Sequence, residues 1–160
     1  MKKRTIYIVI VLFVVVFIIV NNYKPKVKEL EANIPENFNV SRAVIYKEIG
    51  DEFYKKTEDN LSVILPIIEY FNELNFQFVD GHPYRDIYYT FKFYNTNNEV
   101  IRIDIISEDT IWWEISTRTK DSDANTYHFE TQRAYYQLVN AKFDFNELEM
   151  YFQSFSNLSP

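Results

Sequence analysis

The chain has 160 residues, of which 17 are lysine or arginine and 23 are aspartate or glutamate, and it contains two glycines and no cysteine. Apolar residues make up 47% of the chain and aromatic residues 18%, which excludes a disordered protein, and the lack of cysteine excludes a disulfide scaffold and a thiolate-ligated metal. The pI near 5.0 argues against a nucleic-acid binder, which needs a basic surface.

Residues 1–23 predict a membrane anchor. A basic cluster, Met1–Arg4, precedes the uncharged run from Thr5 to Val20, and lysines follow from Lys24 onward. Sixteen helical residues span about 24 Å, and snorkelling lysines close most of the gap to the ~30 Å hydrocarbon core. No small residues follow the run in the pattern that signal peptidase cleaves, so we expect an uncleaved, single-pass signal anchor in the cell membrane.

The rest of the chain is expected outside the cytoplasm, because a basic cluster at the very start of an anchor usually stays inside. Lysines on the other flank make this bias slight. Residues 24–37 are polar, with Pro25 and Pro35, and predict a stalk; residues 38–160 then form one extracytoplasmic domain. That domain is more acidic than the whole chain, which favours a basic partner or a metal ion. The abundance of Asn, Ile, Lys, Tyr and Phe is typical of an AT-rich bacterial genome.

Two segments early in the domain have helical features. Residues 40–49 form either a helix, capped by Ser41 and ended at Gly50, or a strand, and we favour the helix. Pro66 either kinks the following helix or marks its first turn, with residues 61–65 extended before it. That helix begins near Asn60 and has apolar residues at helical spacing: Leu61, Ile64, Leu65, Ile68, Phe71 and Leu74.

Alternation of apolar and polar residues then predicts an antiparallel meander, with strands over 86–94, 100–107 and 111–119. Residues 126–131 predict a fourth strand, and 134–139 either continue it or begin a helix. A last helix follows, with Asp144 as N-cap, Glu147 at N3, a staple between Phe143 and Leu148, and the apolar stripe Leu148, Tyr151, Phe152 and Phe155.

These elements predict a two-layer α+β domain in which an antiparallel sheet packs on helices. The arrangement is similar, by analogy, to the curved sheet wrapped on a helix of the cystatin or nuclear-transport-factor type. Such folds serve binding modules and enzymes alike, so the resemblance implies an architecture and no activity.

No sequence motif for catalysis or phosphate binding is present. In the turn Asp80–Arg85, Asp80 is placed to orient His82 as a base or ligand, with Arg85 positioned for an anion. The alternative, which we favour, is an ordinary turn shaped by Gly81 and Pro83. The other histidine, His128, is expected on a strand at the surface or in the core. We expect no cofactor and no metal.

Charged and aromatic residues on the meander suggest a binding surface. Asp104 and Glu114 form either a carboxylate pair or, as we favour, the acidic partners of Arg102 and Arg118. Alternation predicts that Trp113 lies in the core. It places Trp112 on the polar face with Glu114 and Arg118, where its indole either binds a partner or is covered by a helix of the domain.

The sequence therefore predicts a membrane-anchored binding or accessory protein with a protein or peptide partner and no nucleic acid. Immunity to a secreted peptide toxin, maturation of such a toxin, and a role as a membrane-complex subunit are the candidate settings. The alternative is a small membrane-anchored hydrolase or metal-dependent enzyme that uses His82 and Asp80. The predicted binding residues are Trp112, Glu114 and Arg118, with Asp80, His82 and Arg85 at the edge.

Overall fold

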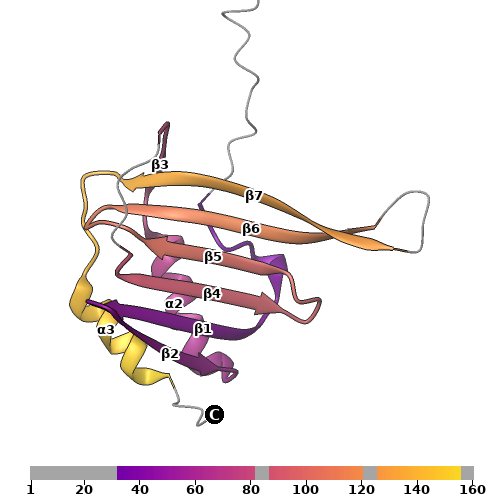
Figure 1. The fold of residues 1–160 in the computed structure, drawn as a ribbon, viewed down its shortest axis with the longest axis horizontal. Coiled ribbons are helices and arrows are strands. Elements are labelled where there is room, and N and C mark those ends of the chain that lie inside the picture. The colour runs from indigo at the N-terminus through magenta and orange to yellow at the C-terminus, as the bar shows by residue number, and fades with distance from the viewer. Residues whose placement is uncertain (1–31, 82–86, 121–125, 156–160) are drawn as a thin grey trace, which may run out of the picture.

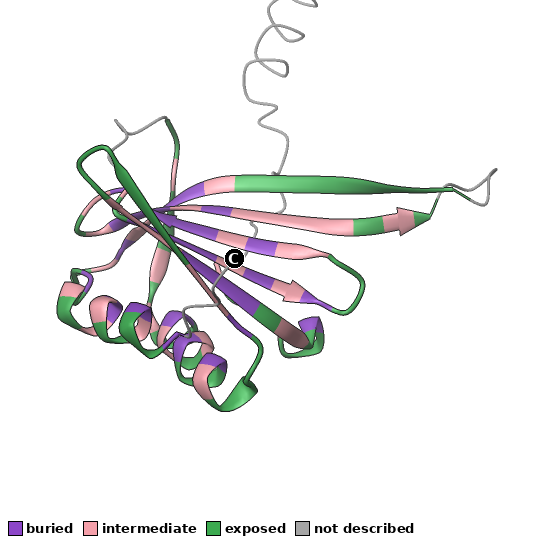
Figure 2. Ribbon diagram, turned by 60° about the horizontal axis from the view of Figure 1, so that its bottom comes forward, coloured by how far each residue is buried: buried purple, intermediate pink, exposed green. Residues whose placement is uncertain are grey.

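A computed structural model describes residues 32–81, 87–120 and 126–155. These residues form one antiparallel sheet of seven strands with helices α2 and α3 against one face (Figure 1; Figure 2), which confirms the α+β architecture. The elements are η1 (Glu36–Phe38), β1 (Val40–Ile49), β2 (Glu52–Glu58), α2 (Leu61–Glu73), β3 (Phe76–Val79), β4 (Tyr89–Asn95), β5 (Val100–Ile105), β6 (Thr110–Lys120), β7 (Tyr127–Leu138) and α3 (Phe145–Ser154).

The predicted anchor, residues 1–23, lies outside the described residues. Among the residues that are described, no helix is long and apolar enough to cross a membrane.

The strands lie in the order β2-β1-β4-β5-β6-β7-β3. The predicted meander is present and continues through β7, a single strand of 12 residues, so residues 134–138 extend the fourth strand and do not begin a helix. β6 and β7 pair beyond the end of β5 and form a two-stranded arm, residues 117–120 with 127–130 (Figure 1).

The prediction of a helix over residues 40–49 is wrong, because this segment is strand β1. β1 lies inside the sheet and pairs with β2 on one side and β4 on the other. Its β-branched residues Val40, Val44, Ile45 and Ile49 suit a strand that has neighbours on both sides. Gly50, expected to end a helix, has a φ of 62° and makes the turn into β2, a strand that the sequence did not predict.

Helix α2 begins where the sequence predicts, with the side chain of Asn60 accepting a hydrogen bond from the Ser62 N–H. Pro66 lies inside the helix, so the alternative of an extended segment before it is wrong. The helix buries Ile64, Ile67 and Phe71. The predicted stripe was shifted on the helix surface, since the structure leaves its members Leu61 and Leu65 exposed.

Helix α3 confirms the predicted N-cap. The Asp144 carboxylate accepts hydrogen bonds from the N–H groups of Asn146 and Glu147, at 2.9 and 3.3 Å. The Glu147 side chain does not complete the capping box in the expected way, because it accepts the hydroxyl of Tyr151 at 2.7 Å. Leu148, Phe152 and Phe155 are buried beneath the sheet together with Phe143.

The core lies between the helices and one face of the sheet. Trp113 is 1% exposed and belongs to it, as predicted. Ile34 is also buried, and its backbone N–H and C=O both bond the side-chain amide of Asn72. The packed part of the chain therefore includes residues before Phe38, within the segment predicted to be a stalk.

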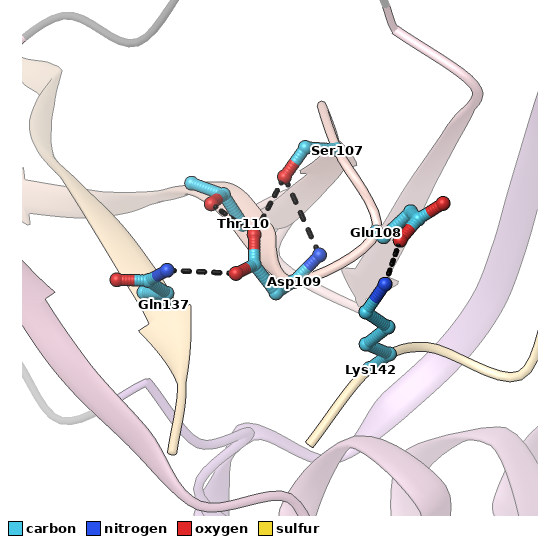
Figure 3. A network of polar contacts seen from close by, with 6 residues as sticks. All are labelled: Ser107, Glu108, Asp109, Thr110, Gln137 and Lys142. Atoms are coloured by element: carbon cyan, nitrogen blue, oxygen red, sulfur yellow. Dashed lines mark hydrogen bonds and ion pairs between the residues drawn. The ribbon is translucent and has the colours of Figure 1, made fainter. Parts of the chain in front are cut away.

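The turn between β5 and β6 holds the end of β7 (Figure 3). The Asp109 carboxylate accepts the Gln137 amide at 2.7 Å and the hydroxyls of Ser107 and Thr110 at 2.8 and 2.9 Å. The hydrogen bond from Gln137 lowers the pKa of Asp109, with further lowering from the two hydroxyls. Charge on this carboxylate therefore contributes to holding β7 in register.

The same turn holds the chain that leads into α3. The Phe143 N–H donates to the Glu108 carbonyl at 2.7 Å, and the Lys142 ammonium pairs with the Glu108 carboxylate (Figure 3). These contacts attach the beginning of α3 to the β5–β6 turn and hold the helix against one face of the sheet. The opposite face is left for other contacts.

Candidate functional site

The face of the sheet opposite the helices, here called the open face, is the candidate site. Side chains alternate along each strand, so the register decides which residues meet on it. One row across β1, β4, β5, β6 and β7 consists of Tyr46, Thr90, Asp104, Trp112 and Tyr135. The next row consists of Val44, Lys92, Arg102, Glu114 and Arg133.

The open face is basic, although the chain as a whole carries a net charge of −6. Its lysine and arginine residues, placed by strand register, are Arg42, Lys55, Lys92, Arg102, Arg118, Lys120 and Arg133. The acidic residues of the same strands on this face are Glu48, Asp104 and Glu114. Helices α2 and α3, by contrast, contain no lysine or arginine, and their charged side chains are all glutamates. The two sides of the sheet therefore differ in the sign of their charge.

The first groove of the open face has a volume of about 260 Å³ and contains Tyr46 at the centre of a cationic cluster. The Lys92 and Lys55 ammonium nitrogens lie 5.1 and 5.9 Å from the centre of the Tyr46 ring. The ring's negative face stabilises both cations. Neither lysine has a carboxylate at ion-pair distance among the described residues. Phe53 and Ile87 add apolar surface to the same groove.

Arg102, which also lines this groove, is held in place by Asp104 on the same strand. Its guanidinium donates from Nε to Asp104 Oδ1 at 2.8 Å and pairs from Nη2 with Oδ2 at 2.7 Å. The Thr90 hydroxyl donates to the same Oδ1 at 2.7 Å. Burial by itself would lower the pKa of Arg102, but the hydrogen bond and charge of Asp104 outweigh it and raise that pKa. The Asp104 side chain is only 4% exposed, so the pair is a fixed part of the face.

The second groove, with a volume of about 320 Å³, lies over β6, β7 and the end of β3. Trp112 and Tyr135 form its aromatic wall, with ring centres 5.1 Å apart in an edge-on arrangement. Among the described residues that line it are one cation, Arg133, and one carboxylate, Asp80. Each groove thus places aromatic rings beside a basic side chain.

The structure brings some of the predicted site residues together. Asp80 and Trp112 line the same groove, and Glu114 lies between Arg102 and Arg133 in the strand register. His82 and Arg85 lie outside the described residues.

Arg118 is separate from this group. It lies six residues along β6 from Trp112, roughly 20 Å at the usual rise of a strand, on the two-stranded arm. Its guanidinium carbon is 3.9 Å from the centre of the Tyr127 ring. The predicted neutralising pairs were cross-strand pairs on a solvated face. Arg102 does pair with Asp104, but within the one strand β5 and with the carboxylate buried, and Arg118 contacts the Tyr127 ring.

The remaining candidates for chemistry show no metal arrangement. His128 lies on β7, as predicted, with its side chain about half exposed and its Nε2 3.5 Å from Glu130 Oε1. No group of three or more His, Asp or Glu side chains among the described residues is arranged to hold a metal ion.

Four residues of the open face were missed from the sequence: Tyr46, Lys55, Lys92 and Arg133. They belong to four different strands, and one of these, β2, was not predicted at all. The alternation of residues 86–94 does place Lys92 on the polar face, so this residue was accessible from the pattern. Tyr46 was not, because its segment was taken for a helix.

No family model matches the chain, no curated protein is significantly similar to it, and no solved structure matches its fold significantly. The function is therefore inferred from the chemistry of the open face.

Proposed function

We propose that this chain is a single-pass membrane protein whose extracytoplasmic domain binds a partner protein or peptide through the open face of the sheet. The observation that carries the proposal is the presence of aromatic rings and cations in both grooves: the Lys92 ammonium lies over the Tyr46 ring in the first, and Trp112 and Arg133 line the second. Aromatic and arginine side chains in partly desolvated recesses are the residues that most often dominate binding energy at protein interfaces.

The charge of the open face favours an acidic segment of the partner. The net charge of the chain predicts a basic partner, but that charge resides largely elsewhere, including the helix layer. Lys55 and Lys92 share one tyrosine ring, and neither has a carboxylate at ion-pair distance among the described residues, although Glu48 lines the same groove. A partner carboxylate would relieve the repulsion between these two ammonium groups. The acidic helix layer would repel the same segment, which orients the encounter.

The size of the grooves favours side chains over a cofactor. Pockets for small molecules usually occupy about 300–1,000 Å³; the first groove, about 260 Å³, is below this range, and the second, about 320 Å³, is at its lower end. Each is suited to one or two side chains of a larger partner. An acidic side chain near Lys92 and an apolar one against Trp112 would occupy both.

The predicted anchor would keep this interaction at the membrane surface. Candidate settings are immunity to a secreted peptide toxin, maturation of such a peptide, and membership of a membrane complex. The architecture within the α+β class remains, by analogy, of the cystatin or nuclear-transport-factor type, in which a curved sheet offers a face for binding.

An enzyme remains the second hypothesis, because Asp80 lines the second groove beside Trp112. A base formed by Asp80 and His82 would then act on a substrate held against the indole. Replacing both residues by alanine separates the two functions. A binding protein should keep both partner capture and the cellular phenotype in this variant. A hydrolase should keep partner capture but lose the cellular phenotype.

Partner capture by the full-length chain tests the proposal. Cells that express the tagged chain are cross-linked, the membranes are solubilised, and captured proteins are quantified for Lys92→Glu, Trp112→Ala and wild type. We expect at least a tenfold loss for Lys92→Glu, and a loss of about 2 kcal/mol in affinity, roughly 30-fold, for Trp112→Ala.

Lys120→Glu is the matched control, since it makes the same charge reversal on the two-stranded arm, away from both grooves. It should retain capture. Folding is verified for each variant by its thermal melting curve. Normal capture by folded Lys92→Glu and Trp112→Ala would show that the open face is not the binding surface.

A further inference from the structure

Strand β2 forms one edge of the sheet and is unusually exposed for a strand with aromatic residues. Phe53 is 71% exposed and Tyr54 43% exposed. Among the described residues, β1 is the only strand that pairs with β2. An edge of this kind presents a row of backbone N–H and C=O groups to another strand.

The hydrogen bonds of β1 determine which groups of β2 point outward. The Glu48 N–H donates to the Tyr88 carbonyl at 3.2 Å, toward the β4 side of β1. Adjacent residues of a strand direct their backbone groups to opposite sides, so Lys47 directs its groups toward β2. Tyr54 lies opposite Lys47 and Phe53 opposite Glu48. Tyr54 therefore bonds inward to β1, while Phe53 and, two residues on, Lys55 direct their N–H and C=O groups outward.

We propose that two copies of this chain pair through β2, as antiparallel edge strands related by a twofold axis at Tyr54. The strand reads Glu-Phe-Tyr-Lys-Lys-Thr-Glu from residue 52, and this register is self-complementary. Glu52 lies opposite Lys56 of the second copy, Phe53 lies opposite Lys55, and Tyr54 lies opposite itself. Opposite charges, a cation beside an aromatic ring and an aromatic pair each stabilise a cross-strand position. Twofold symmetry makes the first two contacts twice.

Other symmetric registers are less favourable. Paired residues must point to the same face of the joined sheet, so the axis must pass through a residue position. An axis at Lys55 places Lys55 against itself and Glu52 against Glu58. An axis at Phe53 pairs only residues 52–54 of each strand. The axis at Lys55 therefore has the longest overlap, residues 52–58, but opposes like charges, whereas the axis at Tyr54 pairs residues 52–56 and opposes unlike charges.

This interface shares Phe53 and Lys55 with the first groove, but it does not involve Lys92, so the two proposals can be tested separately. The twofold axis stands perpendicular to the sheet, so the open faces of the two copies lie on the same side of the joined sheet. Lys55, whose ammonium lies 5.9 Å from the Tyr46 ring, then contacts Phe53 of the second copy as well. The Lys92→Glu variant should abolish partner capture and leave the pairing of the two copies unchanged.

A cysteine at the axis provides a direct test, because the chain contains no cysteine of its own. Tyr54 and its copy form a pair without mutual hydrogen bonds, for which Cα atoms are about 4.5 Å apart, within the range that a disulfide spans. Full-length Tyr54→Cys in isolated membranes, treated with an oxidant, should give a covalent dimer. Neither Glu52→Cys nor Lys56→Cys should form a covalent dimer on its own. The two variants expressed together should form one, because residue 52 of one copy lies opposite residue 56 of the other. The exposed control is Lys120→Cys. Cross-linking of Tyr54→Cys at the level of this control would overturn the proposal.

A charge exchange tests the register independently of the cysteine. Glu52→Lys or Lys56→Glu alone opposes like charges at both ends of the interface, and each should convert the detergent-solubilised chain from dimer to monomer in light scattering. The double variant restores opposite charges and should restore the dimer. A double variant as monomeric as the single ones, or a Tyr54→Cys chain that cross-links only to a different protein, would exclude this pairing.

Discussion

Asp104 is predicted to be the most sensitive polar residue of the open face, and Asp104→Ala isolates its contribution. The carboxylate is 4% exposed and receives Arg102 at two oxygens and the Thr90 hydroxyl at one. Its removal leaves the buried Thr90 hydroxyl without an acceptor, which costs about 1–3 kcal/mol of folding stability. It also leaves the Arg102 guanidinium without its ion-pair partner. Arg102 is 35% exposed, so water replaces part of what it loses, and we expect a total near 3 kcal/mol, the lower end for a broken buried pair.

Urea denaturation monitored by tryptophan fluorescence measures this loss. Both tryptophans of the chain are in β6, and Trp112 is the cross-strand neighbour of Asp104. The matched control is the double replacement Arg102→Met with Asp104→Leu, which removes both charges. The Thr90 hydroxyl loses its acceptor in both variants, so the double variant should lose at least about 1 kcal/mol less than Asp104→Ala, because it leaves no unpaired guanidinium. A loss below about 1 kcal/mol for Asp104→Ala, or equal losses for the single and double variants, would refute the reasoning.

Three further predictions concern stability. Hydrogen bonds from Lys47 and then Gln153 lower the pKa of Glu149 to about 2. The contribution of this carboxylate to folding stability is therefore complete above its ordinary pKa of 4.5 and is lost as the pH falls toward 2. Urea midpoints should drop across that pH window in wild type and change less in Glu149→Gln. Gly50→Ala places a side chain at φ 62° and should cost about 1 kcal/mol in thermal melting, with a smaller loss for Gly50→Asn. Trp113→Ala should cost ~3–5 kcal/mol in urea denaturation, and a loss below about 2 would show that the wrong tryptophan was assigned to the core.

The elements that the sequence predicts well are those with local signals. β4, β5 and β6 alternate cleanly and are joined by short polar turns, and the Asp144 side chain caps α3 by accepting the N–H of Asn146, only two residues away. β1 lacks such a signal, since Ser41 and Gly50 resemble helix caps and only pairing with β2 and β4 selects the strand. β2 reads as a polar segment because it is an edge strand, with little burial to impose alternation.

The open face was predictable only in part. Trp112 and Glu114 belong to one strand, and alternation alone places them on one face. The cluster of Lys55 and Lys92 around Tyr46 requires β1 to pair both with its hairpin partner β2 and with β4, which is distant in the sequence. Its charge also opposes the net charge of the chain, so composition alone does not indicate the charge of this face.

The position of β3 has a consequence for the order in which the chain folds. Among the residues that the structure describes, Phe76–Val79 pairs only with residues 135–138 of β7, at the opposite end of the sheet from β1 and β2. A chain that emerges N-terminus first releases β3 well before its partner strand exists. Until then Phe76 and Phe78 lack the tyrosine Tyr136, whose ring packs edge-on against both. Closing this loop is a non-local event of the kind that slows folding, so the far edge of the sheet forms last. Nascent chains halted before β7 should consequently be sensitive to proteases after Leu74, a vulnerability that ends with synthesis of the last strand.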